Sequence, residues 1–285
     1  AMNNIRTSHT LEEWNALGLT PDANIDLLSA AMLVARDEYP DLDASNYESM
    51  LDAHAKQVRE KMPPDAEAQQ RLLVLSRYLF EEAGFSANHD AFYDPRNSYL
   101  NEVLERRLGI PLSLALVQME LARRLDVPLE GVSFPGHFLV RLQVEDGLLV
   151  LDPYHRGRSI DAEELRQRAS PHVGDTDIDD QQLLQMLAPA SNRAIVVRML
   201  HNLKNLYEQQ EDLERAVRCA DRLVRTAPGE GDLIRDRGLL YHKLGHLTAA
   251  REDLVQYLEQ TPRADDIDTI RSLLIDRAGT PVRLH

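Results

Sequence analysis

The sequence has 285 residues, 43% of them hydrophobic and 28% charged, a composition typical of a protein with a packed core. Its net charge is −15, and the whole excess lies in residues 1–189, because residues 190–285 hold equal numbers of acidic and basic residues. Such an acidic surface repels phosphate groups, which argues against a nucleic-acid partner.

Two further absences in the sequence narrow the class of protein. The single cysteine, Cys219, excludes an internal disulfide framework and a multi-cysteine metal site. No apolar run approaches the roughly 18 residues that span a bilayer, and the first residues lack the apolar core of a signal peptide. We therefore expect a cytoplasmic protein without membrane contact.

Residues 22–125 have the hydrophobic spacing of helices. Pro63 and Pro64 separate the second of these segments from the third, and Gly84 is a stop signal. Pro111 suits the first turn of a helix, where its missing N–H group is not needed. The predicted helices cover residues 22–39, 45–62, 65–85, 97–109 and 111–125.

After residue 130 the period changes to that of strands. Short, branched, apolar segments cover residues 131–134, 137–144 and 148–153, and Glu145-Asp146-Gly147 predicts a hairpin turn. Two more helical segments follow at residues 161–169 and 179–187. Helices followed by an antiparallel hairpin predict an α+β fold, mainly helical with a small antiparallel sheet.

The last third of the chain repeats itself. Two segments with matching tyrosine, leucine and alanine positions end at Pro228 and at Pro262. The spacing of these two prolines resembles the helix–turn–helix period of the tetratricopeptide repeat (TPR), which is about 34 residues. Two copies are fewer than such arrays usually need, so we expect residues 266–278 to form a capping helix and the array to lean on the first domain.

Three polar residues follow one another in an order that suits catalysis. Ser113 lies in the first turn of a predicted helix, His137 begins one hairpin strand, and Asp152 ends the next. A hydroxyl at a helix N-terminus, an imidazole and a carboxylate on neighbouring strands fit the roles of nucleophile, base and orienting group. The hairpin also predicts that His137 and Asp152 are in direct contact.

The motifs around these residues resemble a known superfamily. The segments DPRNSYLNEVLERRLGIPLSLALVQMELARRL, FPGHFLVRL and LDPYHRGR, in that order, resemble the bacterial SirB-type branch of the transglutaminase-like superfamily, in which C-terminal TPRs follow the core. The resemblance implies a papain-like core. Active members of the superfamily use a Cys–His–Asp triad, and the resemblance places its histidine at His137 and its aspartate at Asp152.

The cysteine of that triad falls at Ser113, which is a departure from the active pattern. A thiol near a helix N-terminus and an imidazolium can ionise at neutral pH, whereas a hydroxyl must lose its proton during attack. Ser113 is also compatible with an ordinary role in the first turn of a helix. His155 is a second candidate imidazole, and Asn97 and Asn101 are candidate oxyanion donors.

The repeats suggest a binding surface instead. Aligning the two copies places polar side chains on the inner face of their leading helices, suited to an acidic segment or a terminal carboxylate. The candidate peptide-binding residues are Arg198, His201, Asn202, Asn205 and Arg235. His242 and His246 are separated by a turn at Gly245 and lack a third ligand, so we expect no metal site and no cofactor.

The sequence thus predicts four regions: a helical extension (1–90), a transglutaminase-like core (91–189), two TPRs (190–264), and a capping helix and tail (265–285). Two functions stay open. The chain is either a cytoplasmic, non-catalytic adaptor that binds a protein or peptide through its TPR groove, or a Ser–His–Asp hydrolase or acyl-transferase acting on protein or peptide amides. The sequence determines neither the partner nor the oligomeric state.

Overall fold

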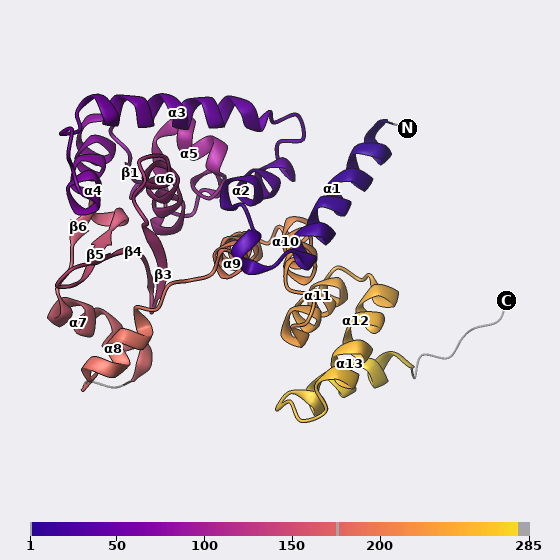
Figure 1. Ribbon diagram of the computed structural model, residues 1–285. Helices are drawn as coiled ribbons and strands as arrows, with labels where there is room; N and C mark the ends of the chain where they lie inside the picture. Colours follow the sequence, from indigo (N-terminus) through magenta and orange to yellow (C-terminus); the bar gives the residue numbers. More distant parts are fainter. Residues whose placement is uncertain (1, 175–176, 279–285) are drawn as a thin grey trace. The chain divides into compact units, whose positions relative to one another are not determined.

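A computed structural model describes residues 2–174 and 177–278 (Figure 1). Its contacts divide the chain into two compact units. Unit 1 combines Ala1–Thr20 with Leu200–His285, and unit 2 is Pro21–Met199. The division expected at residue 90 does not separate the units, because the helices before it pack on those after it.

Unit 2 is built around the helix α6 (Pro111–Arg124), which is buried along most of its length. The helices α3 (Ala44–Glu60), α4 (Ala68–Arg77) and α5 (Leu100–Arg106) all pack against it, and α2 (Leu27–Arg36) packs on α5. Aspartates cap two of them: Asp26 accepts from Ser29 N at 2.7 Å, and Asp43 from Ser45 N at 3.0 Å. Residues 21–90 of the segment predicted as a separate extension thus share a core with the residues that follow them.

The sheet of unit 2 has four antiparallel strands in the order β3-β4-β5-β6. They are β3 (Glu130–Phe134), β4 (His137–Val144), β5 (Gly147–Asp152) and β6 (Arg158–Ser159). Two-residue turns join the first three, because Phe134 pairs with His137 and Val144 with Gly147. This confirms the predicted hairpin and the predicted α+β class. A short parallel pair, β1 (Ser86–Ala87) with β2 (Leu108–Gly109), was not predicted.

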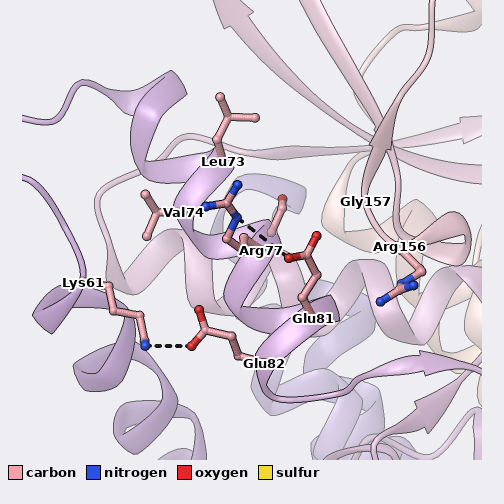
Figure 2. Close-up of a pocket in the computed structure, with 9 residues that line it drawn as sticks. Lys61, Leu73, Val74, Arg77, Glu81, Glu82, Arg156 and Gly157 are labelled. Carbon is pink, nitrogen blue, oxygen red and sulfur yellow. Dashed lines mark ion pairs between the residues drawn. The ribbon is translucent and has the colours of Figure 1, made fainter.

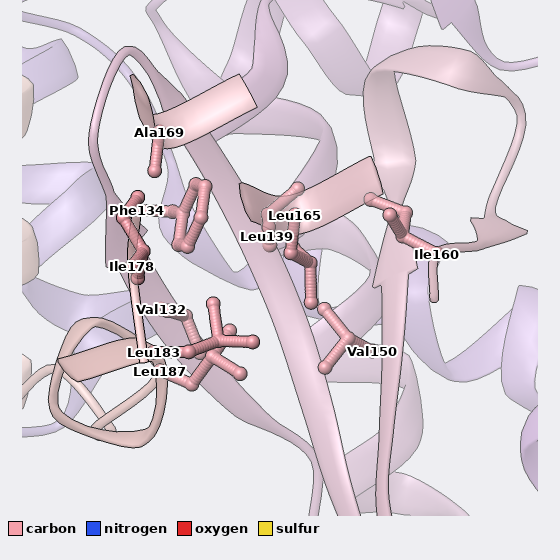
Figure 3. Close-up of a cluster of buried hydrophobic side chains, with 10 residues drawn as sticks. All are labelled: Val132, Phe134, Leu139, Val150, Ile160, Leu165, Ala169, Ile178, Leu183 and Leu187. Atoms are coloured by element: carbon pink, nitrogen blue, oxygen red, sulfur yellow. The ribbon is translucent and has the colours of Figure 1, made fainter. Parts of the chain in front are cut away.

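The two faces of this sheet pack on different helices. Strand residues on one face share a buried cluster with α7 (Ala162–Val173) and α8 (Asp180–Met186), as Figure 3 shows. Side chains alternate along a strand, so His137 and Asp152 belong to this same face. The buried Phe138, Val140 and Leu142 lie on the opposite face, and α6 packs against β4.

Unit 1 contains the repeats. Helix α9 (Asn192–Gln209) runs from unit 2 into it, followed by α10 (Leu213–Thr226), α11 (Gly231–Lys243), α12 (Leu247–Gln260) and α13 (Ile267–Ala278). The predicted repeat is confirmed by α10 and α12, whose first and last residues have the same spacing as Pro228 and Pro262. The same spacing relates two turn residues with positive φ, Glu211 (59°) and Gly245 (80°).

The first helix of the chain, α1 (Met2–Leu19), also belongs to unit 1. It packs on α10, where the Arg222 guanidinium lies 5.8 Å from the centre of the Trp14 ring and Arg225 Nη1 donates to Asn15 Oδ1 at 2.8 Å. At the other end of the array, α13 packs on α12 through a small cluster around Leu254, Tyr257 and Ile270. Within the described residues, no helix is both long enough and apolar enough to cross a membrane.

Candidate functional site

Ser113 lies at the start of α6, as predicted, but its hydroxyl is fully engaged by the backbone. The Oγ atom donates to the carbonyl of Asn97 at 2.6 Å and accepts from the N–H of Ile110 at 3.0 Å. The residue is 2% exposed. No hydrogen bond among the described residues joins it to His137 or Asp152. The hydroxyl therefore closes the N-terminus of α6, which is a structural role.

His137 begins β4 and is half-buried. Its ring lies 6.5 Å from that of Phe134 and 6.4 Å from that of His172 on α7, measured between ring centres. Burial, together with the positive charge of Arg168, lowers the pKa of His137 despite the nearby carboxylate of Asp152. The neutral imidazole is therefore favoured, which does not suit a charged imidazolium partner for a thiolate.

Asp152 is 2% exposed, and its carboxylate already has other partners. The Oδ2 atom accepts from Arg168 Nη1 at 2.6 Å and from His155 Nδ1 at 2.5 Å, while Oδ1 accepts from the N–H of Tyr154 at 3.0 Å. Burial would raise the pKa of Asp152, but the hydrogen bonds from Arg168 and His155 outweigh it and lower that pKa. Among the described residues no hydrogen bond joins Asp152 to His137, because Arg168 and His155 occupy the carboxylate; the direct contact of these two side chains stays a prediction.

His155, the second candidate imidazole, is thus the histidine that pairs with Asp152. Its side chain is 48% exposed, and the ionised carboxylate favours the tautomer with a proton on Nδ1, which leaves Nε2 as an acceptor. Asp152 ends β5 and caps the short turn Pro153–His155, which brings the two side chains together. The short spacing of Asp152 and His155 in the segment DPYH was the feature of the sequence from which this pairing could have been predicted.

The surface beside His155 is rich in aromatic rings. Tyr154 donates or accepts a hydrogen bond of 3.1 Å with His89 Nδ1, and its ring meets those of His155 and Phe92 edge to face. Phe92 and Tyr93 are 41% and 65% exposed. Sequence reasoning missed this cluster, because its members come from a loop before α5 and from the turn after β5.

Neither candidate oxyanion donor is free for that role. Asn97 is fully buried, and its amide donates to the carbonyl of Ala91 at 2.7 Å and accepts from Asn88 at 3.0 Å. It therefore holds the loop before α5. Asn101 is 4% exposed, and its side-chain oxygen, which is an acceptor, is the atom left without a hydrogen bond. An oxyanion needs donors, and the donor group of Asn101, its side-chain NH2, is hydrogen-bonded to the Tyr47 hydroxyl.

Both predicted peptide-binding arginines already have partners within their own units. Arg198 donates to Ser133 Oγ and to the carbonyl of His137 at 3.2 Å, with its guanidinium 5.5 Å from the centre of the Phe138 ring. Arg235 donates to Asp236 at 3.0 Å and to Asp266 at 3.1 Å. Neither guanidinium is therefore free to bind the carboxylate of a peptide in the way that was predicted.

The remaining predicted groove residues lie on α9 in unit 1. His201 is half-buried, and burial followed by the charge of Lys204 lowers its pKa. Asn202 and Asn205 have no hydrogen-bond partner for their side chains among the described residues. A pocket of about 360 Å³ is bounded by three helices of unit 1, α9, α11 and α13, and none of these predicted residues is part of its lining. Its lining is Lys204, Glu208, Asp236, Leu239, Leu240, His242, Lys243 and Leu273.

Comparison with known families agrees with both units. A description of the transglutaminase-like superfamily matches residues 45–201, and a TPR description matches residues 203–275. The chain therefore belongs to the transglutaminase-like superfamily and carries C-terminal TPRs, as the resemblance implied. The match begins within α3, so the region before residue 91 is partly core.

Curated relatives place the chain more narrowly. A UPF0162 protein of Xylella fastidiosa is 48% identical over 272 residues, covering 95% of this chain and 97% of the relative. The UPF0162 protein of Pseudomonas aeruginosa is 34% identical, covering 81% and 83%. The UPF0162 protein YchA of Escherichia coli K12 is 27% identical, covering 88% and 91%. The chain belongs to this UPF0162 family.

Among residues 2–174 and 177–278, no group of three or more histidine, cysteine, aspartate or glutamate side chains is arranged to hold a metal ion. His242 and His246 lie on either side of the turn at Gly245, as the sequence predicted.

Proposed function

We propose that the chain is a cytoplasmic, non-catalytic adaptor that binds a segment of a partner protein in the groove of its TPRs. The main support is the groove itself, a pocket of about 360 Å³ with an apolar base of Leu239, Leu240 and Leu273. TPR arrays recognise peptides by this face. The hydroxyl of Ser113 adds support. It is buried and makes two hydrogen bonds to the backbone, so it is not a ready nucleophile.

The chemistry of the groove suggests what the segment carries. The leucines accept an apolar side chain, while Lys204 pairs with Glu208 at 2.9 Å and Lys243 lies 4.0 Å from the same carboxylate. The side-chain amides of Asn202 and Asn205 lie on the same helix, α9, outside the lining of this pocket, and are suited to hydrogen-bond the backbone of a peptide that extends beyond it. We therefore expect a short extended segment with one apolar anchor between polar residues, without help from Arg198 or Arg235.

To test this proposal, a peptide that binds the full-length protein is first selected from a random library, and its affinity for variants of the groove is then measured. Leu239→Glu places a charge on the apolar base of the groove and is expected to weaken binding by at least about tenfold, since a carboxylate there cannot accept an apolar side chain. Arg271→Ala, on an exposed site of α13, is the matched control and should bind as the wild type does. Equal affinity of Leu239→Glu and the wild type, by calorimetry, would exclude the groove.

The pair of His155 and Asp152 favours one alternative, a hydrolase or acyl-transferase acting on peptide amides. An imidazole that is oriented by a carboxylate and has a 48% exposed side chain is equipped to act as a general base. In this alternative His155 is the base in place of His137 and water is the nucleophile in place of Ser113, so the reaction with water is hydrolysis of the amide. Loss of peptide-amide hydrolysis in His155→Gln, with retention in Ser113→Ala, would establish it.

A further inference from the structure

A second pocket lies in unit 2, away from Ser113. It has a volume of about 620 Å³, within the range of small-molecule sites, and is bounded by the end of α3, by α4 with the π-helix Tyr78–Glu82, and by the loop after β5. Figure 2 shows its lining side chains. They are Lys61, Leu73, Val74, Ser76, Arg77, Glu81, Glu82, Arg156 and Gly157.

The charged groups of this pocket include three cations and two carboxylates. Lys61 pairs with Glu82 at 2.7 Å, whereas Arg77 lies 3.8 Å from Glu81, beyond hydrogen-bonding distance. These side chains are 41–75% exposed, so both pairs are weak and easily exchanged for a ligand. The side chains that line the pocket thus carry a net positive charge, in a region of the chain that is otherwise strongly acidic.

Arg156 is the cation without a partner. Within the residues that the structure describes, its guanidinium makes no ion pair and no hydrogen bond. Its backbone is left-handed, with φ of 60°, a conformation that favours glycine or asparagine over arginine. Among the described residues, a ligand can therefore approach this guanidinium without displacing a partner.

The neighbouring glycine fixes the position of that arginine. Gly157 has φ of 71°, and a Cβ atom there would lie 2.9 Å from the Phe80 ring and 3.4 Å from Ser76 Cβ. Its N–H donates to the carbonyl of Asp152 at 2.8 Å. The loop is therefore held tightly against α4 and the π-helix, so that Arg156 and Arg77 line the same pocket.

We propose that this pocket binds a small organic anion whose carboxylate or phosphate group lies between Arg77 and Arg156. Guanidinium groups suit both head groups, since each offers paired N–H donors to two oxygens. Leu73, which is 53% exposed, and Val74 provide an apolar wall for a short aliphatic part of the ligand. This inference is independent of the TPR groove.

The test is a titration of the full-length protein with hexanoate, hexyl phosphate, inorganic phosphate and hexylamine, followed by backbone amide NMR. Hexanoate or hexyl phosphate should give saturable shifts at residues 73–77, 81–82 and 156–157, and comparison of the two identifies the head group. Hexylamine should give none. Inorganic phosphate should bind more weakly than hexyl phosphate, because it lacks the part that contacts Leu73.

Arg156→Gly is the decisive variant, because glycine tolerates the left-handed backbone and the loop keeps its conformation. It should weaken binding about tenfold, as expected for loss of a charge-assisted hydrogen bond. Arg77→Ala should do the same. Arg123→Ala, an exposed arginine paired with Glu120 on α6, is the control and should bind as the wild type does.

Three results would overturn the inference. One is the absence of saturable shifts at these amides with either hexyl anion. Another is equal binding by Arg156→Gly and the wild type while the variant keeps the wild-type spectrum elsewhere. The third is equal affinity for inorganic phosphate and hexyl phosphate. It would show that Leu73 and Val74 do not contact the ligand and that the pocket binds anions only in a general way.

Discussion

Replacing Ser113 by alanine should destabilise unit 2 without removing any activity. The change leaves the part-buried N–H of Ile110 and the buried carbonyl of Asn97 without the partner they have now. Each such loss costs about 1 kcal/mol or somewhat more, so the variant should lose about 2–3 kcal/mol of unfolding free energy. The matched control is Ser29→Ala. Ser29 also lies three residues after an N-cap, but it is exposed. Ser29→Ala should therefore change the free energy of unfolding by no more than about 0.5 kcal/mol.

The assay is urea unfolding followed by far-UV circular dichroism, with amide hydrogen exchange of α6 as the local readout. Exchange should speed up at the start of α6 in Ser113→Ala and stay unchanged in Ser29→Ala. Ser113→Cys adds a chemical readout, and its buried thiol should react with iodoacetamide no faster than glutathione does. It should also be better tolerated than Ser113→Phe, which overpacks the site. Unchanged stability in Ser113→Ala, or a fast-reacting thiol in Ser113→Cys, would refute a structural role.

Other contacts give further predictions. Arg168→Met should cost about 3–5 kcal/mol at neutral pH, because it leaves the buried carboxylate of Asp152 without its cation. Because the pKa of Asp152 is lowered, its ionised carboxylate stabilises the folded protein at pH values above the ordinary aspartate pKa of about 3.9, and this stabilisation is lost as the pH falls. The difference in unfolding free energy between wild type and variant, measured by urea unfolding, should therefore become smaller in acid. Gly238→Ala should destabilise unit 1 by about 1–3 kcal/mol, since its Cβ atom would lie 3.0 Å from Asp253 Cβ. The fluorescence of the single tryptophan, which lies on α1, reports the unfolding of this unit. A variant more stable than the wild type would contradict the close packing at Gly238. Arg156→Gly should unfold within about 1 kcal/mol of the wild type, because relief of the left-handed strain offsets the entropy of glycine; a larger loss of thermal stability would show that the arginine side chain supports the fold.

The repeats were the most predictable part of the fold, because each leading helix and its neighbour follow local rules that recur along the chain. The repeat extends even to backbone hydrogen bonds, since Asp212 N donates to the carbonyl of Tyr207 and His246 N to that of Tyr241. Helix α1 could not be inferred in the same way. It has little apolar patterning of its own and is held by contacts with α10, which lies far from it in the sequence.

The candidate site was predictable as a set of elements but not as a set of contacts. Ser113, His137 and Asp152 lie at the predicted helix and strand ends. Their partners depend on tertiary structure: α7 carries Arg168 to the carboxylate, and the loop before α5 offers the carbonyl that takes the hydrogen bond of the hydroxyl. The pairing of Asp152 with His155 is local, through a capping turn, and was accessible from the sequence.

The central claim is that the chain binds a peptide in its TPR groove without reacting with it. Mass spectrometry of a groove-selected peptide, after incubation with the wild type and with the double variant Ser113→Ala/His155→Ala, tests this most directly. We expect the peptide to keep its full mass with both proteins, and both to bind it with equal affinity. A cleaved peptide, or an acyl group transferred to the protein, that forms with the wild type and not with the double variant would contradict the account.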